Sequence, residues 1–94
     1  MPTIRIDEVV IGREKDFDDV AHLVNVGHLE LVDERRFEAH GFHNDPVNKV
    51  YYSIAKAAGR IDANTAVIME ERSTKKGRYR ADVSFYRDLK RKGL

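Results

Sequence analysis

The chain has 94 residues and a mass of 10.8 kDa, which suits one domain and leaves too little for a second core. Hydrophobic residues make up 41% and charged residues 35%, and the lack of cysteine excludes a disulfide scaffold, a thiolate metal site and a cysteine nucleophile. The net charge of +1 argues against avid nonspecific DNA binding, and no segment has the roughly 20 apolar residues of a membrane span.

The first quarter of the chain predicts a strand followed by a helix. Thr3–Ile11 alternates in part between apolar and polar residues, and Gly12 would end this strand. Glu14–Val26 has the apolar spacing of one helix face, at Phe17, Val20, Ala21 and Val24. Gly27 is a natural end for that helix. A strand over 20–32 competes with its second half, because valine and leucine are frequent there.

Two further strands and a second helix are predicted next. His28–Val32 and Arg36–Phe42 read as strands that turn at Asp33-Glu34. Asp45 is a suitable N-cap and Pro46 a suitable first residue for a helix that would end at Gly59. Its apolar stripe consists of Val47, Val50, Tyr51, Ile54 and Ala58.

The last part of the chain predicts a β-hairpin. Ala63–Met69 is a nearly continuous apolar run, as in a central strand covered by a helix on at least one side. Ser73–Gly77 would form the turn. In the last strand the predicted buried face comprises Tyr79, Ala81, Val83 and Phe85, and the exposed face comprises Arg78, Arg80, Asp82, Ser84 and Tyr86.

These elements give the order β-α-β-β-α-β-β. We therefore predict an α+β domain, a two-layer sandwich in which an antiparallel sheet carries two helices on one face. Residues 1–88 would form the single domain and residues 89–94 a basic C-terminal tail.

Residues 36–87 also resemble the YdgH/BhsA/McbA-like family of small bacterial stress and envelope domains. The resemblance rests on Ala39-His40-Gly41-Phe42, Ala55-Lys56-Ala57-Ala58-Gly59, Ala63-Asn64-Thr65-Ala66-Val67-Ile68 and Phe85-Tyr86-Arg87. It implies a bacterial β-α-β-β domain and supplies no catalytic residues. Members of that family are exported, whereas the N-terminal residues here have no apolar leader core, so we expect a cytoplasmic protein unless a leader was removed.

No residue pattern predicts catalysis or a cofactor. The four histidines, at 22, 28, 40 and 43, have no spacing typical of a metal site, and adjacent carboxylates such as Glu70-Glu71 project in different directions. The glycines are dispersed as turns and stops, without a phosphate-binding loop. We therefore expect no enzyme activity, no cofactor and no metal site.

The basic C-terminal part holds the candidate binding residues. Residues 1–46 have five basic and eleven acidic residues, a net charge of −6, whereas residues 47–94 have twelve and five, a net charge of +7. This split either pairs the two halves with each other or provides a basic binding face. The candidate contacts for nucleic acid or an acidic partner are Arg72, Lys75, Lys76, Arg78, Arg80, Tyr86, Arg87, Lys90, Arg91 and Lys92.

Two functions are compatible with these features. The first is a non-enzymatic binding or regulatory module that forms a homo-oligomer or binds a protein partner, through a sheet edge or a helix face. The alternative is a nucleic-acid-binding protein that uses the basic hairpin 72–80 and the C-terminal tail. Neither function involves a membrane.

Overall fold

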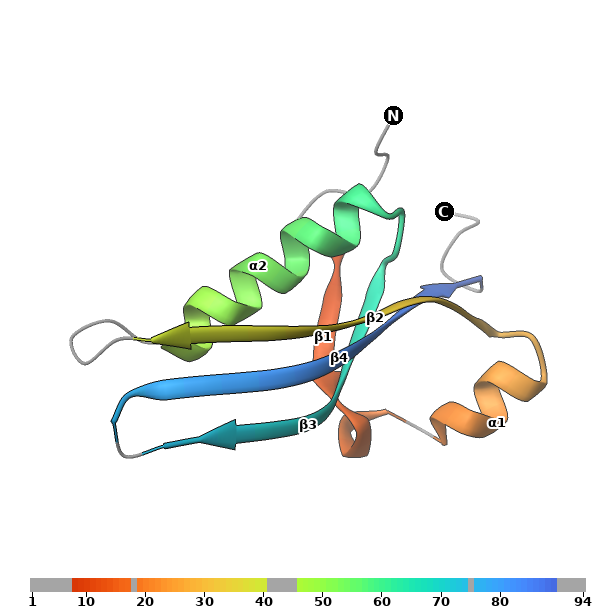
Figure 1. Cartoon of the computed structure of the whole chain (residues 1–94). Coiled ribbons are helices and arrows are strands. Elements are labelled where there is room, and N and C mark those ends of the chain that lie inside the picture. Colours follow the sequence, from red (N-terminus) through yellow and green to blue (C-terminus); the bar gives the residue numbers. More distant parts are fainter. Residues whose placement is uncertain (1–7, 18, 41–45, 75, 90–94) are drawn as a thin grey trace.

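A mixed four-stranded sheet forms the centre of the domain. The computed structural model describes residues 8–17, 19–40, 46–74 and 76–89. The strands lie side by side in the order β1-β3-β4-β2 (Figure 1), with β1 at Val10–Arg13, β2 at Leu29–His40, β3 at Thr65–Ser73 and β4 at Arg78–Asp88. This sheet and its α-helices confirm the predicted α+β class.

The strand directions differ from the antiparallel sheet that we predicted. β2 and β3 both run antiparallel to β4, but β1 runs parallel to β3, with Val10 opposite Thr65 and Arg13 opposite Ile68. Parallel neighbours need a long crossover between them, and the chain from β1 through β2 to β3 supplies one. Apolar periodicity indicates which residues are buried and not which way a strand runs, so it could not reveal this.

β2 is a single long strand where two strands and a turn were predicted. It pairs with β4 from Leu29 to His40, with an irregularity between Leu31 and Asp33 that is typical of a β-bulge. The Asp33 carboxylate accepts hydrogen bonds from the Glu34 backbone N–H at 2.9 Å and from the Arg35 side chain at 2.6 Å. The eleven-residue β4 offers backbone partners along this whole stretch, which outweighs the turn preference of Asp33.

Helix α2, at Pro46–Arg60, covers one face of the sheet (Figure 1). Its predicted stripe is confirmed, because Val50, Ile54 and Ala58 are at most 1% exposed. They pack on the sheet residues Ala66, Ile68, Tyr79, Ala81, Val83 and Phe85. Phe85 meets Phe37 of β2 edge to face, with ring centroids 6.0 Å apart. The predicted N-cap, Asp45, lies outside the described residues.

The other helix lies on the opposite face, which corrects the prediction of two helices on one face. Helix α1, at Val20–Asn25, follows the 3-10 turn η2, at Glu14–Asp16. α1 covers a second apolar cluster that consists of Val20, Leu29, Val67 and Tyr86, with Phe17 and Leu23 packed against it. Val67 alternates with Ala66 and Ile68 along β3, so both sides of this strand are buried and each side needs a helix. α1 is shorter than predicted and begins after Asp19, whose carboxylate accepts from the His22 N–H at 3.1 Å.

The remaining element boundaries shift by a few residues. β1 begins at Val10, although the strand was predicted over 3–11, of which residues 3–7 lie outside the described part. β3 begins at Thr65 and continues to Ser73, beyond the predicted end at Met69, because β4 pairs with it along that length. Gly77, with φ of +79°, closes the hairpin turn that follows β3, as predicted.

Candidate functional site

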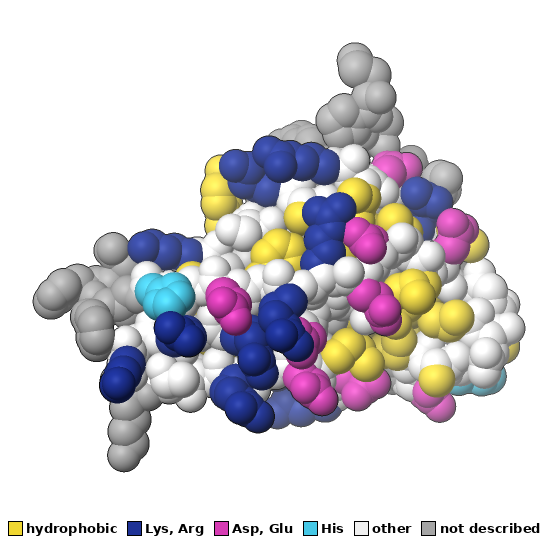
Figure 2. All heavy atoms as spheres, in the orientation of Figure 1, with side chains coloured by type: hydrophobic (Ala, Val, Ile, Leu, Met, Phe, Trp, Pro, Cys, Tyr) yellow, Lys and Arg dark blue, Asp and Glu magenta, His cyan; other side chains and the backbone are white. Residues whose placement is uncertain are grey.

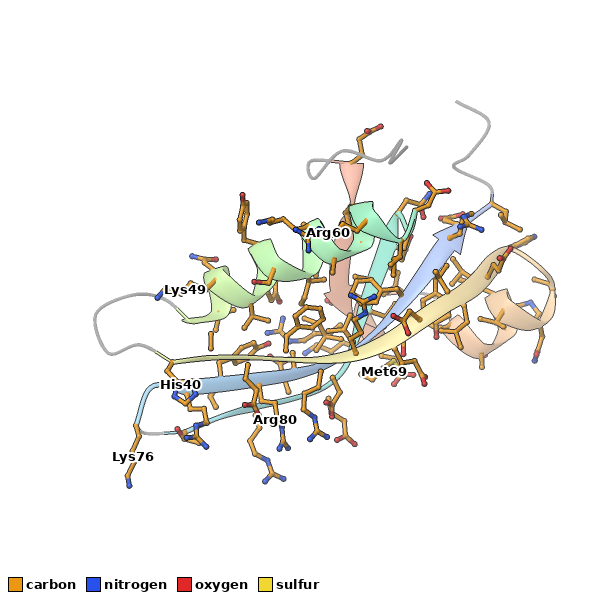
Figure 3. All side chains as sticks on the ribbon, turned by 45° about the horizontal axis from the view of Figure 1, so that its top comes forward. His40, Lys49, Arg60, Met69, Lys76 and Arg80 are labelled. Atoms are coloured by element: carbon orange, nitrogen blue, oxygen red, sulfur yellow. The ribbon has the colours of Figure 1, made fainter. Side chains whose placement is uncertain are left out.

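One face of the sheet remains partly open. α1 covers only the end formed by Leu29, Val67 and Tyr86, and the strands continue beyond it. There the register sets outward-facing residues in cross-strand rows: Glu38–Arg80–Arg72, Arg36–Asp82–Glu70 and His40–Arg78. Figure 3 shows Arg80 on the side of the sheet away from Lys49 and Arg60 of α2. We call Arg72, Arg78 and Arg80 the arginine cluster.

The cluster differs from the other described arginines of the sheet in forming no ion pair with a carboxylate of the described residues. Each of those others forms an ion pair: Arg13 with Glu71, Arg35 with Asp33 at 2.6 Å, Arg36 with Asp82 at 2.7 Å and Arg87 with Glu30 at 3.2 Å. Within residues 8–17, 19–40, 46–74 and 76–89, no ion pair includes Arg72, Arg78 or Arg80. Arg80 lies near the carboxylates of Glu38 and Asp82, but no described carboxylate holds any of the three guanidinium groups in an ion pair, so these groups can bind a partner.

The position of the cluster has an energetic cost. Arg72 and Arg80 lie directly opposite each other on β3 and β4, and like charges in such pairs destabilise a sheet. Glu38, opposite Arg80 on β2, moderates this repulsion. The same side chains, with Thr74, line a surface hollow of about 230 Å³. An anion bound in this hollow would reduce the repulsion between Arg72 and Arg80. The arrangement therefore favours the binding of negatively charged groups.

Several basic side chains lie at this end of the molecule. Figure 2 shows Lys and Arg side chains gathered over the end of the sheet near the β3–β4 hairpin, while Asp and Glu side chains are more frequent toward α1. Lys76 lies at the tip of that hairpin and His40 at the adjacent end of β2 (Figure 3). The predicted contacts Arg72, Lys76, Arg78 and Arg80 thus come together in space.

The other predicted contacts do not join the cluster. The expected exposure of Tyr86 is wrong, because α1 covers its ring and leaves it 7% exposed. Arg87 lies toward the opposite end of β4, where it donates to the Asp62 backbone oxygen at 3.1 Å and pairs with Glu30. Lys75, Lys90, Arg91 and Lys92 lie outside the described residues.

Glu38, His40 and Thr74 were missed as site residues. They belong to different elements, and only the pairing register of β2 and β3 with β4 places them beside the arginines. The strand predicted over 36–42 contains Glu38 and His40, but the sequence could not identify their neighbours on β4.

Ion pairs between the acidic residues 1–46 and the basic residues 47–94 do not neutralise the opposite net charges of these two halves among the described residues. Three of the ion pairs join the halves, but two of them, Arg13–Glu71 and Arg36–Asp82, link a base of the acidic half to an acid of the basic half. Among the described residues, only Arg87–Glu30 neutralises a base of the second half with an acid of the first. Pairing with the first half therefore leaves most of the described basic residues of the second half without an acidic partner from the first half.

A polar network on the α2 side ties the end of β1 to the hairpin. Tyr79 donates its hydroxyl hydrogen to Glu71 Oε1 at 2.9 Å, and Arg13 donates to the same carboxylate, at 3.0 Å from its Nη2. The Arg13 hydrogen bond is the main cause that lowers the pKa of Glu71, and burial is the main cause that raises the pKa of Tyr79. The network is structural, since its members bind one another.

We predict that a Glu71→Gln variant is less stable than the native chain at pH 7, by about 1 kcal/mol, because Arg13 and Tyr79 lose a charged acceptor. The pKa of Glu71 is lower in the folded state, so its contribution is complete above the ordinary value of 4.5 and is lost as the pH falls through the folded pKa. Urea unfolding from pH 7 to about pH 3 would test this. An unchanged difference across that range would contradict it.

The fold and this face define a small α+β domain whose mixed sheet is covered by a helix on one side and left half open on the other. Comparison with protein-family models, with curated proteins and with solved structures gave no match to this chain. The resemblance to the YdgH/BhsA/McbA-like family therefore stays a prediction.

Within the described ranges, no helix is long and apolar enough to cross a membrane, and no group of three or more His, Asp or Glu side chains is placed to hold a metal ion.

Proposed function

We propose that this chain is a non-enzymatic binding module whose arginine cluster binds the phosphate backbone of duplex nucleic acid. The observation that carries the proposal is the absence of ion pairs at Arg72, Arg78 and Arg80 among the described residues, in a sheet where the other described arginines are paired. Unpaired guanidinium groups bind phosphate oxygens well, because their donors match two oxygens at once.

The geometry of the face supports contact with several phosphates. Arg78 and Arg80 are two residues apart on β4, about 7 Å along the strand, and Arg72 is a cross-strand neighbour of Arg80 at about 5 Å. Long arginine side chains at this spacing can reach neighbouring phosphates. The sheet around them is open and not enclosed by α1.

Among the described residues, no tyrosine or phenylalanine presents an exposed ring beside the cluster, where His40 is the exposed ring, and this supports a duplex over a single strand. Single-strand binders stack bases on aromatic side chains, but Tyr79 is 2% exposed and Tyr86 is 7% exposed. Contacts to phosphates alone are independent of base sequence. We therefore expect weak, salt-dependent binding with little sequence preference.

A fluorescence anisotropy titration with a labelled duplex of about 20 base pairs, from about 20 to about 200 mM salt, tests this function. With three phosphate contacts we expect log K to fall with log salt at a slope of about −2.7. A single strand and a polyglutamate peptide of equal charge serve as comparisons. Absence of duplex binding at the lowest salt would overturn the proposal, and tighter binding of the peptide would assign the face to an acidic protein.

A further inference from the structure

β2 is an edge strand whose outer side has no partner among the described residues. It lies last in the strand order and has 12 residues, a long stretch of free backbone groups. We propose that β2 pairs antiparallel with β2 of a second copy, with Phe37 on the two-fold axis, so that two sheets become one. This inference does not depend on the proposed function, because it rests on the free edge of β2 and not on the arginine cluster, although Glu38 and His40 lie beside both.

The proposed register follows from the charges beyond the bulge. With Phe37 opposite itself, Arg36 faces Glu38 of the second copy and Glu34 faces its His40, each pair occurring twice by symmetry. All four side chains lie on the open face of the sheet, where the opposite charges of Arg36 and Glu38 are favourable in cross-strand pairs and the His40 ring can donate a hydrogen bond to the Glu34 carboxylate. On the α2 face, Arg35 meets Ala39, and no like charges are opposed.

Neighbouring registers are disfavoured by the same charges. With Arg36 on the axis, Arg36 would face itself and Glu34 would face Glu38. With Glu38 on the axis, Glu38 would face itself and Arg36 would face His40. With Arg35 on the axis, Arg35 would face itself. With Ala39 on the axis, Glu38 would face His40, but Arg36 and Glu34 would gain no charged partner among the described residues. Of these alignments, the one with Phe37 on the axis therefore makes the largest number of favourable cross-strand pairs.

The side chains of Arg36 and Phe37 are exposed enough to contact the second copy. Arg36 is paired with Asp82 on β4, but its side chain is 59% exposed, so it can bridge Asp82 and Glu38 of the second copy. Phe37 is half-buried against the core and would cover its remaining surface with its own copy. The axis stands perpendicular to the sheet, so both arginine clusters would lie on one side of the dimer.

Disulfide trapping tests the register, since the native chain has no cysteine. Residues 36 and 38 of the two copies would be directly opposite, with Cα atoms about 5 Å apart, within disulfide range. Each residue and its own copy would be diagonal, at about 7 to 8 Å, beyond easy reach. We expect a mixture of Arg36→Cys and Glu38→Cys proteins to form covalent dimers at least about tenfold faster than either protein alone.

A Tyr52→Cys variant, on the exposed side of α2, is the matched control for random collision, because Tyr52 is 58% exposed. Equal rates for the mixture and the single variants would overturn the register, and faster dimerisation of Arg36→Cys alone would place Arg36 on the axis instead.

Sedimentation of the native chain provides the second measurement. The interface is small, so we expect weak association in which the mass rises above 10.8 kDa with concentration; a constant 10.8 kDa up to about 1 mM would overturn the dimer itself.

Discussion

Replacing Arg72, Arg78 and Arg80 together by glutamine is expected to lower the affinity for duplex DNA by about 10² to 10³-fold at about 50 mM salt. Each arginine that neutralises a phosphate releases a counterion, so the loss of three contacts should also flatten the salt slope by about 2.7. Glutamine keeps a long polar side chain and removes only the charge. Anisotropy titration at several salt concentrations measures both effects.

The matched control removes the same charge from the other face. Lys49, Lys56 and Arg60 are exposed on α2, and Figure 3 shows Lys49 and Arg60 on the side opposite Arg80. Glutamine at these three positions changes the net charge equally but leaves the cluster intact, so we expect less than about a threefold loss of affinity. Equal losses in the two variants would mean that binding depends on net charge and not on this face.

Thermal unfolding of the cluster variant adds an independent check. Because Arg72 and Arg80 repel each other across β3 and β4, their neutralisation should leave the melting temperature unchanged or raise it. A lower melting temperature would show that the cluster supports the fold, which is contrary to a binding role.

A Phe85→Ala variant is expected to lose about 3 to 5 kcal/mol of stability. Phe85 is completely buried under α2 and meets Phe37 edge to face, so its removal leaves a cavity and breaks a contact between β4 and β2. For a domain of this size, the total free energy of unfolding is about 5 to 15 kcal/mol, and much of it would be lost. Urea denaturation monitored by circular dichroism gives the change.

Tyr52→Ala is the matched control for the loss of an aromatic ring. Tyr52 is 58% exposed, and its described ring contact is the Lys56 ammonium, 5.4 Å from the ring centroid. We expect a change of at most about 0.5 kcal/mol. A loss below about 1 kcal/mol for Phe85→Ala would contradict the burial of this ring between α2 and the sheet.

The sequence by itself determined the elements whose signals are local. Pro46 and the stripe through Val50, Ile54 and Ala58 specified α2 almost to the residue, because a helix repeats every 3.6 residues and its start has its own residue preferences. The alternation of Tyr79, Ala81, Val83 and Phe85 likewise specified the buried face of β4. It also placed Arg78 and Arg80 on the other face, and thus part of the candidate site.

Only the tertiary structure decided how these elements combine. Pairing with β4 kept β2 continuous through Asp33, where local preference indicates a turn, and a crossover made β1 parallel to β3. The placement of α1 on the second face buried Tyr86, although its alternation position is that of an exposed residue. These outcomes depend on contacts between distant residues, which periodicity does not encode. The strand register that sets Arg72 beside Arg80 also depends on such contacts, and neither arginine forms an ion pair within the described residues.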